Sequence, residues 1–326
     1  MSWSPDAAHA PKVNEYPFPG RARVANLKES PGSSPPERLT HILSWLDAGK
    51  LDPIQWRRIP VRGGLEVAVS SDNISSGAVR LVGPMAAAQH IADANDALIP
   101  TAGIVDAIYK ARDATAPPQT IGWEVTKSDG TKSWKNPGGG KDWWLYYNDR
   151  LVAAGLPPTP GVIQSPLSKD YVLDARQDQH PDRCAIYGLH KTNGEPTQSK
   201  ETGASFIHEL PFFDYSHGIR LVSTTAWLDG EEVSLPWIYQ NRPELVSYKG
   251  LPVGPIPIRH PAIPRRKQPP KLALVPSGIV PGYQPVVDIT PSETPKKKKG
   301  LGLGFVVAAA AAVWAFFFAG KKESSS

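Results

Sequence analysis

Residues 218–235 read GIRLVSTTAWLDGEEVSL, and this stretch decides the fold class. Apolar and β-branched residues lie on both sides of Asp229-Gly230, a pair typical of the tight turn of a β-hairpin. The same pattern of short apolar runs separated by turn residues begins near Lys169. The region therefore predicts short antiparallel strands, at 171–173, 184–190, 218–223, 225–228 and 231–235.

Helical spacing is more common earlier in the chain. Leucines and isoleucines within 35–49 repeat at the interval of one helix face. The aromatic run 143–147 is expected to form either a buried strand or a wall that stacks on a sugar or peptide. Further helices are expected at 84–96 and 101–111, with strands at 65–69 and 78–82. This order predicts an α+β fold, in which helices are followed by a small, mostly antiparallel sheet in a single domain.

Prolines and lysines concentrate toward the two ends of the chain and divide it into parts. Residues 300–320 carry no charge, and about 20 apolar residues at about 1.5 Å each would cross a hydrocarbon core of about 30 Å. They predict a C-terminal transmembrane helix, with a buried core helix or a hydrophobic assembly peg as the alternative. The expected parts are an extended proline-rich arm at 1–35, an α+β hydrolase-like domain at 36–258, a proline- and lysine-rich linker at 259–299, the hydrophobic helix at 300–320 and a polar tail at 321–326.

Charge and cysteine content limit the classes of function. The formal net charge is +5, but six lysines lie after residue 295, so the rest of the chain is close to neutral. No nucleic-acid partner is therefore expected, because such proteins carry a basic face that follows the phosphates. The single cysteine, Cys184, excludes an internal disulfide and is expected to be a buried, unreactive thiol.

Chemically capable side chains gather between residues 169 and 220, which hold four of the eight histidines. Imidazole is the side chain best suited to proton transfer or metal binding near neutral pH, so the site is expected here. By contrast, Asp72 and Asp106 are isolated carboxylates and are expected to be turn formers or solvated residues. The candidate site residues are Lys169, Asp170, His190, Gln198, His208, Asp214, Ser216, His217 and Arg220.

Three chemistries fit this set. His190, His208 and His217, or two of them with Asp214, could bind one divalent metal ion such as zinc, which would activate a water molecule. Alternatively, the histidines work as acid and base without metal, or they are structural and bond loop backbone. Strand parity places His190 on one face with Cys184. In a regular strand, Ser216 and His217 point apart, which excludes a serine activated by its sequence neighbour.

The run also resembles a known group of sequences. It resembles the "aIYGWH…GxPIQ…H…DYSHGiRLV" series of an uncharacterised bacterial protein family. The residues that carry the resemblance are AIYGLH at 185–190, Gly194, Pro196 and Gln198, His208, and DYSHGIRLV at 214–222. The chain departs from it at Leu189, where the family has tryptophan. It also departs at Thr197, where the family has an aliphatic residue, and at Ser168, where the family has a basic or aromatic residue. The resemblance implies that the polar side chains form one site, and it implies no particular activity.

These observations favour a hydrolase that acts on a cell-envelope polymer, either the peptide or the glycan of peptidoglycan. Its three candidate histidines would bind metal or transfer protons, and Asp214 would orient them. Lys169 and Arg220 would hold an anionic substrate or oxyanion, while Asp170, Gln198 and Ser216 would position it. The expected partners are that polymer and a lipid bilayer contacted by 300–320. The expected location is a membrane or a virion. The alternative is a non-enzymatic structural or assembly protein of a phage particle or membrane complex.

Overall fold

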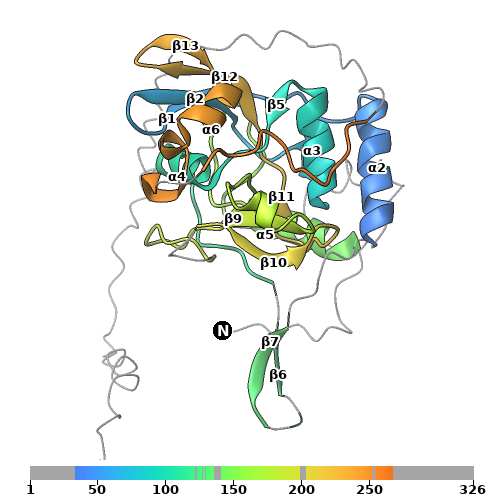
Figure 1. The fold of residues 1–326 in the computed structure, drawn as a ribbon. Coiled ribbons are helices and arrows are strands. Elements are labelled where there is room, and N and C mark those ends of the chain that lie inside the picture. Colours follow the sequence, from blue (N-terminus) through green and yellow to red (C-terminus); the bar gives the residue numbers. More distant parts are fainter. Residues whose placement is uncertain are drawn as a thin grey trace, which may run out of the picture. The chain divides into compact units, whose positions relative to one another are not determined.

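The computed structural model describes residues 34–266, except for 122, 127, 129, 136–140, 199–202 and 252–253 (Figure 1). Helices alternate with strands along this part of the chain. The helices are α2 (Pro35–Asp47), α3 (Met85–Ala94), α4 (Ala102–Lys110), α5 (Lys141–Ala153) and α6 (Leu235–Asn241), with single 3₁₀ turns η3 (Gln177–Gln179), η4 (Pro243–Leu245) and η5 (Tyr248–Gly250). The strands are β1 (Trp56–Pro60), β2 (Leu65–Ser70), β3 (Ser75–Ser76), β4 (Val79–Arg80), β5 (Ala97–Leu98), β6 (Trp123–Thr126), β7 (Lys132–Lys135), β8 (Lys169–Tyr171), β9 (Arg183–Gly188), β10 (Ser205–Glu209), β11 (His217–Gly218), β12 (Val222–Leu228) and β13 (Glu231–Ser234).

The larger sheet has the order β1-β2-β12-β13, and β5 pairs with the first residues of β12 on the side opposite β2. All of its pairs are antiparallel, with Val69 opposite Val222 and Val67 opposite Ala226. The predicted hairpin at Asp229-Gly230 is confirmed, because it joins β12 to β13 and both residues have the positive φ that such turns require. Buried valines from strands far apart in the sequence thus form the centre of this sheet.

The smaller sheet has the order β10-β9-β8-β11, and its last pair, β8 with β11, is parallel. After β11 the chain continues directly into β12 of the larger sheet. Gly218 lies at this crossing, where a Cβ atom would come within 2.2 Å of both Asn73 Nδ2 and Ser168 Oγ. Only glycine therefore allows β11 to approach these two segments so closely.

Helices α2 and α3 lie side by side and share one core with the sheets (Figure 1). The buried face of α2 carries Ile42, Trp45 and Leu46, whereas Leu39 and Leu43 of the predicted stripe are only partly buried. Arg38 of the same helix is also buried, and its guanidinium lies 5.0 Å above the ring of Trp144. Its aliphatic stem and planar head thus act as part of the apolar packing.

The predicted fold needs correction in three respects. The class is α+β with a sheet-rich core, but β1 and β2 precede most helices and pair with the late strand β12, so helices do not simply come before the sheet. The aromatic run 143–147 is part of helix α5 rather than a strand. Trp144, Tyr147 and Leu151 are buried and lie three and four residues apart, as on one face of a helix. The sequence suggested a strand because aromatic residues are common in strands. The third correction concerns the membrane.

No helix in the described part of the chain is both long and apolar enough to cross a membrane. The α+β fold of the described residues therefore does not include the transmembrane helix that the sequence predicted. The segment expected to form it, 300–320, lies outside the described residues, as do the arm at 1–33 and residues 267–299.

Residues 259–266, which the sequence assigned to the linker, pack against the domain. Arg259 pairs with Asp93 of α3 at 2.9 Å, and Arg266 pairs with Asp47 of α2 at 2.7 Å. His260 is completely buried between them, and its backbone N–H donates to the side chain of Gln89 at 3.0 Å. These contacts tie the end of the described chain to two helices near its beginning.

Candidate functional site

The structure divides the predicted site residues between two clusters. The first, called here the Asp214 cluster, consists of Lys169, His208, Asp214, Ser216 and His217. The second surrounds Asp106 and contains His190, which the sequence had grouped with the other histidines. Arg220, Asp170 and Gln198 belong to neither and make other contacts.

The Asp214 cluster is built by the parallel pairing of β8 with β11, which sets Lys169 opposite His217. Lys169 Nζ donates to Asp214 Oδ2 at 3.0 Å. Ser216 donates its backbone N–H and its hydroxyl to Asp214 Oδ1, at 2.8 and 2.6 Å. A turn at 215–216 precedes β11, so Ser216 and His217 both face Asp214 instead of pointing apart as they would in a regular strand. His217 Nε2 remains 3.8 Å from Asp214 Oδ1.

Electrostatics in this cluster favour an ionised Asp214 beside a neutral His217. Burial opposes ionisation of Asp214, but the charges of His217 and Lys169 and the bonds from Ser216 hold its pKa well below the usual range. Burial lowers the pKa of His217 to about 4, although Asp214 attracts its proton. Burial, and then the charge of Lys169, also lower the pKa of His208.

Access to the Asp214 cluster is limited. Ser216 and His217 are completely buried, and His217 Nδ1 lies 3.3 Å from the hydroxyl of Tyr171. His208 is partly exposed but stacks on Phe212 with ring centroids 4.1 Å apart. In this conformation a substrate could touch only His208 and the Lys169 side chain, which is 16% exposed. The cluster therefore holds strands together more directly than it offers a reaction site.

Arg220, expected to hold substrate, instead binds the protein's own backbone. It donates to the carbonyls of Ser70 and Ser71, both at 3.1 Å, and to that of Gln164 at 2.9 Å. Asp170 lies 3.7 Å from its Nε. Burial raises the pKa of Asp170, against the attraction of Arg220. Gln198 donates to the neighbouring Thr197 hydroxyl at 2.8 Å.

His190 takes part in a different arrangement because β9 ends at Gly188. Gly188 and Leu189 both have positive φ, +108° and +49°, and turn the chain out of strand geometry. The parity prediction for His190 was therefore wrong: the residue returns toward Tyr187 rather than toward Cys184. His190 Nε2 lies 2.8 Å from Asp106 Oδ1, which also accepts the Tyr187 hydroxyl at 2.7 Å.

Two aromatic rings fix the His190 imidazole. Tyr109 stacks on it with ring centroids 4.4 Å apart and an interplanar angle of 18°, and Tyr187 meets it edge-on at 5.7 Å. Burial, and then the Asp106 carboxylate, raise the pKa of Tyr187 well above the usual range, so this hydroxyl stays a donor. Asp106 and Tyr109 both come from α4, one helical turn apart.

A pocket of about 260 Å³ opens beside this pair, and it is called here the Asp106 pocket. Its wall includes two cationic residues, Lys110 and Lys249, together with Glu195. Lys249 adopts a left-handed φ of +52°, a conformation that costs energy for a residue other than glycine and that clusters at functional sites. The lining is Asp106, Tyr109, Lys110, Tyr187, His190, Gly194, Glu195, Pro196, Tyr248 and Lys249.

Asp106 is the residue that sequence reasoning missed, since it was expected to be solvated or to form a turn. The available signal was its spacing on the 101–111 helix. Asp106, Tyr109 and Lys110 follow one another at i, i+3 and i+4 and so share a polar face beside the apolar stripe.

The expected three-histidine metal site is not formed by the residues described. His208 and His217 lie near each other, with ring centroids 5.2 Å apart, but His190 belongs to the Asp106 pocket. Within the described ranges, no group of three or more histidine, cysteine, aspartate or glutamate residues is arranged to hold a metal ion. Cys184 is buried, as predicted, and burial raises its pKa to about 12.

Comparisons with protein-family models, with curated proteins and with solved structures found no match for this chain. Its function is therefore inferred from the geometry of its own side chains. The carboxylate–imidazole contact at the wall of a pocket is the arrangement with the clearest chemical use.

Proposed function

We propose that the domain is a hydrolase in which His190, oriented by Asp106, activates a water molecule in the Asp106 pocket. The observation that carries the proposal is the 2.8 Å contact between His190 Nε2 and Asp106 Oδ1. A carboxylate that accepts from one ring nitrogen fixes the tautomer and leaves the other nitrogen as a base. This is the role that general-base catalysis requires.

In the proposed reaction, one proton moves from water to His190 and then from His190 to the leaving group. Nε2 of His190 carries the hydrogen that Asp106 accepts, so Nδ1 has the free electron pair. The contact with Asp106 involves Nε2 alone, and only 2% of the His190 side chain is exposed, so water reaches Nδ1 from the pocket that this residue lines. Nδ1 takes a proton from water as the water oxygen bonds to the scissile carbon. The same nitrogen then returns the proton to the leaving group as the scissile bond breaks.

Charge and size of the pocket indicate the part of a substrate that would enter. The lining holds two lysines, Lys110 and Lys249, and two carboxylates, Asp106 and Glu195, so either lysine could meet the oxyanion of an intermediate although the pocket has no excess of positive charge. The volume of about 260 Å³ is close to the lower end of ligand pockets, about 300 Å³. The pocket therefore suits one unit at the end of a chain. We propose a terminal unit of the peptide or glycan of a cell-envelope polymer.

The Asp214 cluster would support this site without touching substrate. Lys169 of β8 lies opposite Gly188 of β9, the residue at which the chain turns toward His190. The backbone N–H of Leu189 donates to Ser168 of the same segment at 2.9 Å. The Lys169–Asp214 pair thus helps to fix the strand from which His190 projects.

The activity test uses the full chain and purified peptidoglycan, with release of soluble amino acids and sugars as the readout. His190→Gln and Asp106→Asn are expected to lower the rate by about 10²-fold or more, the typical contribution of general acid–base catalysis. The matched control is His208→Gln, which removes a partly exposed histidine outside the pocket. The melting temperatures of all three variants should stay close to that of the parent protein. Full activity in His190→Gln would contradict the proposal.

A non-enzymatic structural or assembly role is the second candidate, and one observation favours it. β10 is an edge strand of the smaller sheet and carries Ile207, a residue that is 69% exposed. Edge strands with exposed apolar side chains pair readily with other chains. Unchanged activity in both pocket variants, together with concentration-dependent assembly of the parent protein, would favour this role over hydrolysis.

A further inference from the structure

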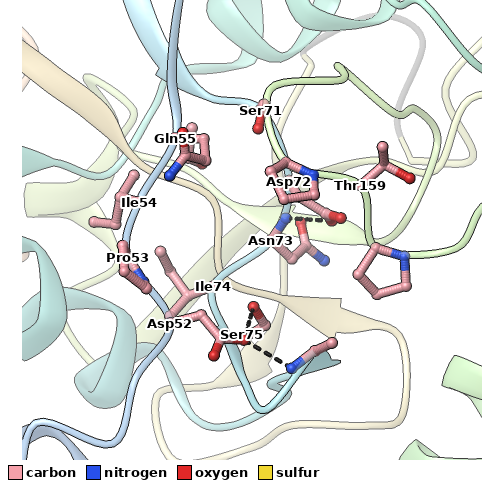
Figure 2. Close-up of a pocket in the computed structure, with 14 residues that line it drawn as sticks. Asp52, Pro53, Ile54, Gln55, Ser71, Asp72, Asn73, Ile74, Ser75 and Thr159 are labelled. Carbon is pink, nitrogen blue, oxygen red and sulfur yellow. Dashed lines mark hydrogen bonds between the residues drawn. The ribbon is translucent and has the colours of Figure 1, made fainter. Parts of the chain in front are cut away.

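A second pocket, of about 310 Å³, lies away from the Asp106 pocket, and it is called here the proline pocket (Figure 2). It is formed by the segment before β1, by the segment that follows β2 and by 158–160. Pro53, Pro158 and Pro160 form part of its wall, together with Ile54 and Ile74. These five residues give the pocket one apolar wall, and the polar residues of the lining include Asp52, Asp72 and Asn73.

The amide of Asn73 has a fixed orientation in this pocket. Its Nδ2 donates to Ser168 Oγ at 2.9 Å, and Ser168 Oγ donates in turn to Asp170 Oδ1. Because the serine proton goes to the carboxylate, the serine oxygen must accept from Asn73, and Nδ2 must be the atom facing it.

The other atom of the same amide, Oδ1, has no hydrogen-bond partner within the described part of the chain, although Asn73 is only 5% exposed. A buried acceptor without a donor is unfavourable. A ligand in the proline pocket that brings an N–H or O–H donor would remove this deficit.

Charge in the pocket is negative and only partly balanced. Asp72 is neutralised by Arg80, which donates to both of its carboxylate oxygens at 2.6 and 2.8 Å. Asp52 accepts from neutral groups, the Ser75 hydroxyl at 2.7 Å and two backbone N–H groups. The residues described as lining the pocket include no lysine, arginine or histidine. Asp52 therefore leaves a negative charge at the pocket that a cation would balance.

We propose that the proline pocket binds the ammonium end of an alkylamine. The ammonium group carries three N–H donors and a positive charge, and so suits both Asn73 Oδ1 and Asp52. Its methylene chain packs against the proline and isoleucine walls. A neutral alcohol could donate to Asn73 but would leave the charge of Asp52 unbalanced. This binding site is independent of the proposed hydrolase chemistry.

The test is titration calorimetry of the full chain with n-butylamine, and n-butanol is the matched neutral probe. Millimolar binding of the amine is expected, weakened by added salt. Asp52→Asn should weaken it about tenfold or more, in keeping with loss of a charge-assisted hydrogen bond. Glu66→Gln, which removes a carboxylate of β2 that pairs with Arg58 outside the pocket lining, should leave it unchanged. A second variant, Thr159→Trp, should block the pocket without removing charge.

Three results would overturn the assignment. The first is the absence of measurable amine binding, and the second is equal binding of n-butanol and n-butylamine. The third is unchanged amine binding in both Asp52→Asn and Thr159→Trp, which would place the amine elsewhere. Loss of binding in Thr159→Trp, with a folded protein by circular dichroism, supports the site even if Asp52→Asn fails to fold.

Discussion

Single residues decide how closely the two sheets approach, and Gly218 is the clearest case. It lies against Asn73 and Ser168, whose side chains are both buried and hydrogen-bonded to each other. Neither side chain is long or flexible enough to move aside for a larger residue at position 218. The sequence alone showed a glycine after His217, but it could not show which segments would meet it.

Gly218→Ala is therefore expected to destabilise the fold by roughly 1–3 kcal/mol, the usual effect of inserting a methyl group into a packed interior. Urea denaturation followed by circular dichroism measures the change. The matched control is Gly254→Ala, because a Cβ atom at Gly254 would meet no atom within 4 Å. Equal stability of the two variants would show that the segments around Gly218 can relax.

Acid should destabilise the protein partly through His217. Its pKa is about 4 in the folded state and 6.5 in the reference state, so the unfolded chain binds the proton more tightly. The stabilisation is complete above pH 6.5 and is lost as the pH falls toward 4, with a total of roughly 3 kcal/mol for this one residue.

The measurement is the melting temperature between pH 4 and 7, for the parent protein and for His217→Gln. The variant is expected to lose less stability over this range, because glutamine does not take up a proton. His208→Gln serves as the comparison and should have a smaller effect, since His208 is partly exposed. An identical pH profile for the parent protein and His217→Gln would contradict this assignment.

At the scale of elements, regular patterns were predictable and their interruptions were not. The helices near 35–47, 85–94 and 102–110 and the hairpin at Asp229-Gly230 followed from spacing and turn chemistry. The positive φ of Gly188 and Leu189 did not, because a leucine gives no sign of a left-handed conformation. That one turn moved His190 from the expected metal site to Asp106.

The segment 254–266 is an element without regular structure that is held by side chains. His260 Nε2 lies 2.9 Å from both Gln177 Nε2 and the carbonyl of Arg183, at the start of β9. His260→Ala is expected to release this segment and to lower the free energy of unfolding by about 2 kcal/mol or more, since it empties a buried, hydrogen-bonded position.

Hydrogen exchange read by mass spectrometry tests this prediction locally. Protection should fall in 254–266 and around η3, while the β12–β13 hairpin should keep its protection. His41→Ala, a change in α2 outside the buried core, provides the comparison. Unchanged exchange in 254–266 would mean that the two arginine pairs hold the segment without His260.

At the scale of the whole molecule, the α+β class and the approximate strand positions could be predicted, but the pairing of strands could not. β2 and β12 are neighbours although about 150 residues separate them in the chain, and local sequence patterns carry no information about such contacts. The same limit applies to the site. The sequence identified the polar side chains of 169–220, whereas their division between Asp214 and Asp106 depends on tertiary contacts.

The direct passage from β11 to β12 also limits how this domain can be recombined. One short stretch, His217–Leu228, belongs to both sheets, so a breakpoint between β11 and β12 would separate β12 and β13 from the β1 and β2 strands of the larger sheet. The two sheets therefore cannot be exchanged as separate modules. The hairpin β6–β7 pairs only with itself in the described sheets and projects from the remaining fold (Figure 1). It is the position at which an inserted or swapped segment would leave both sheets intact.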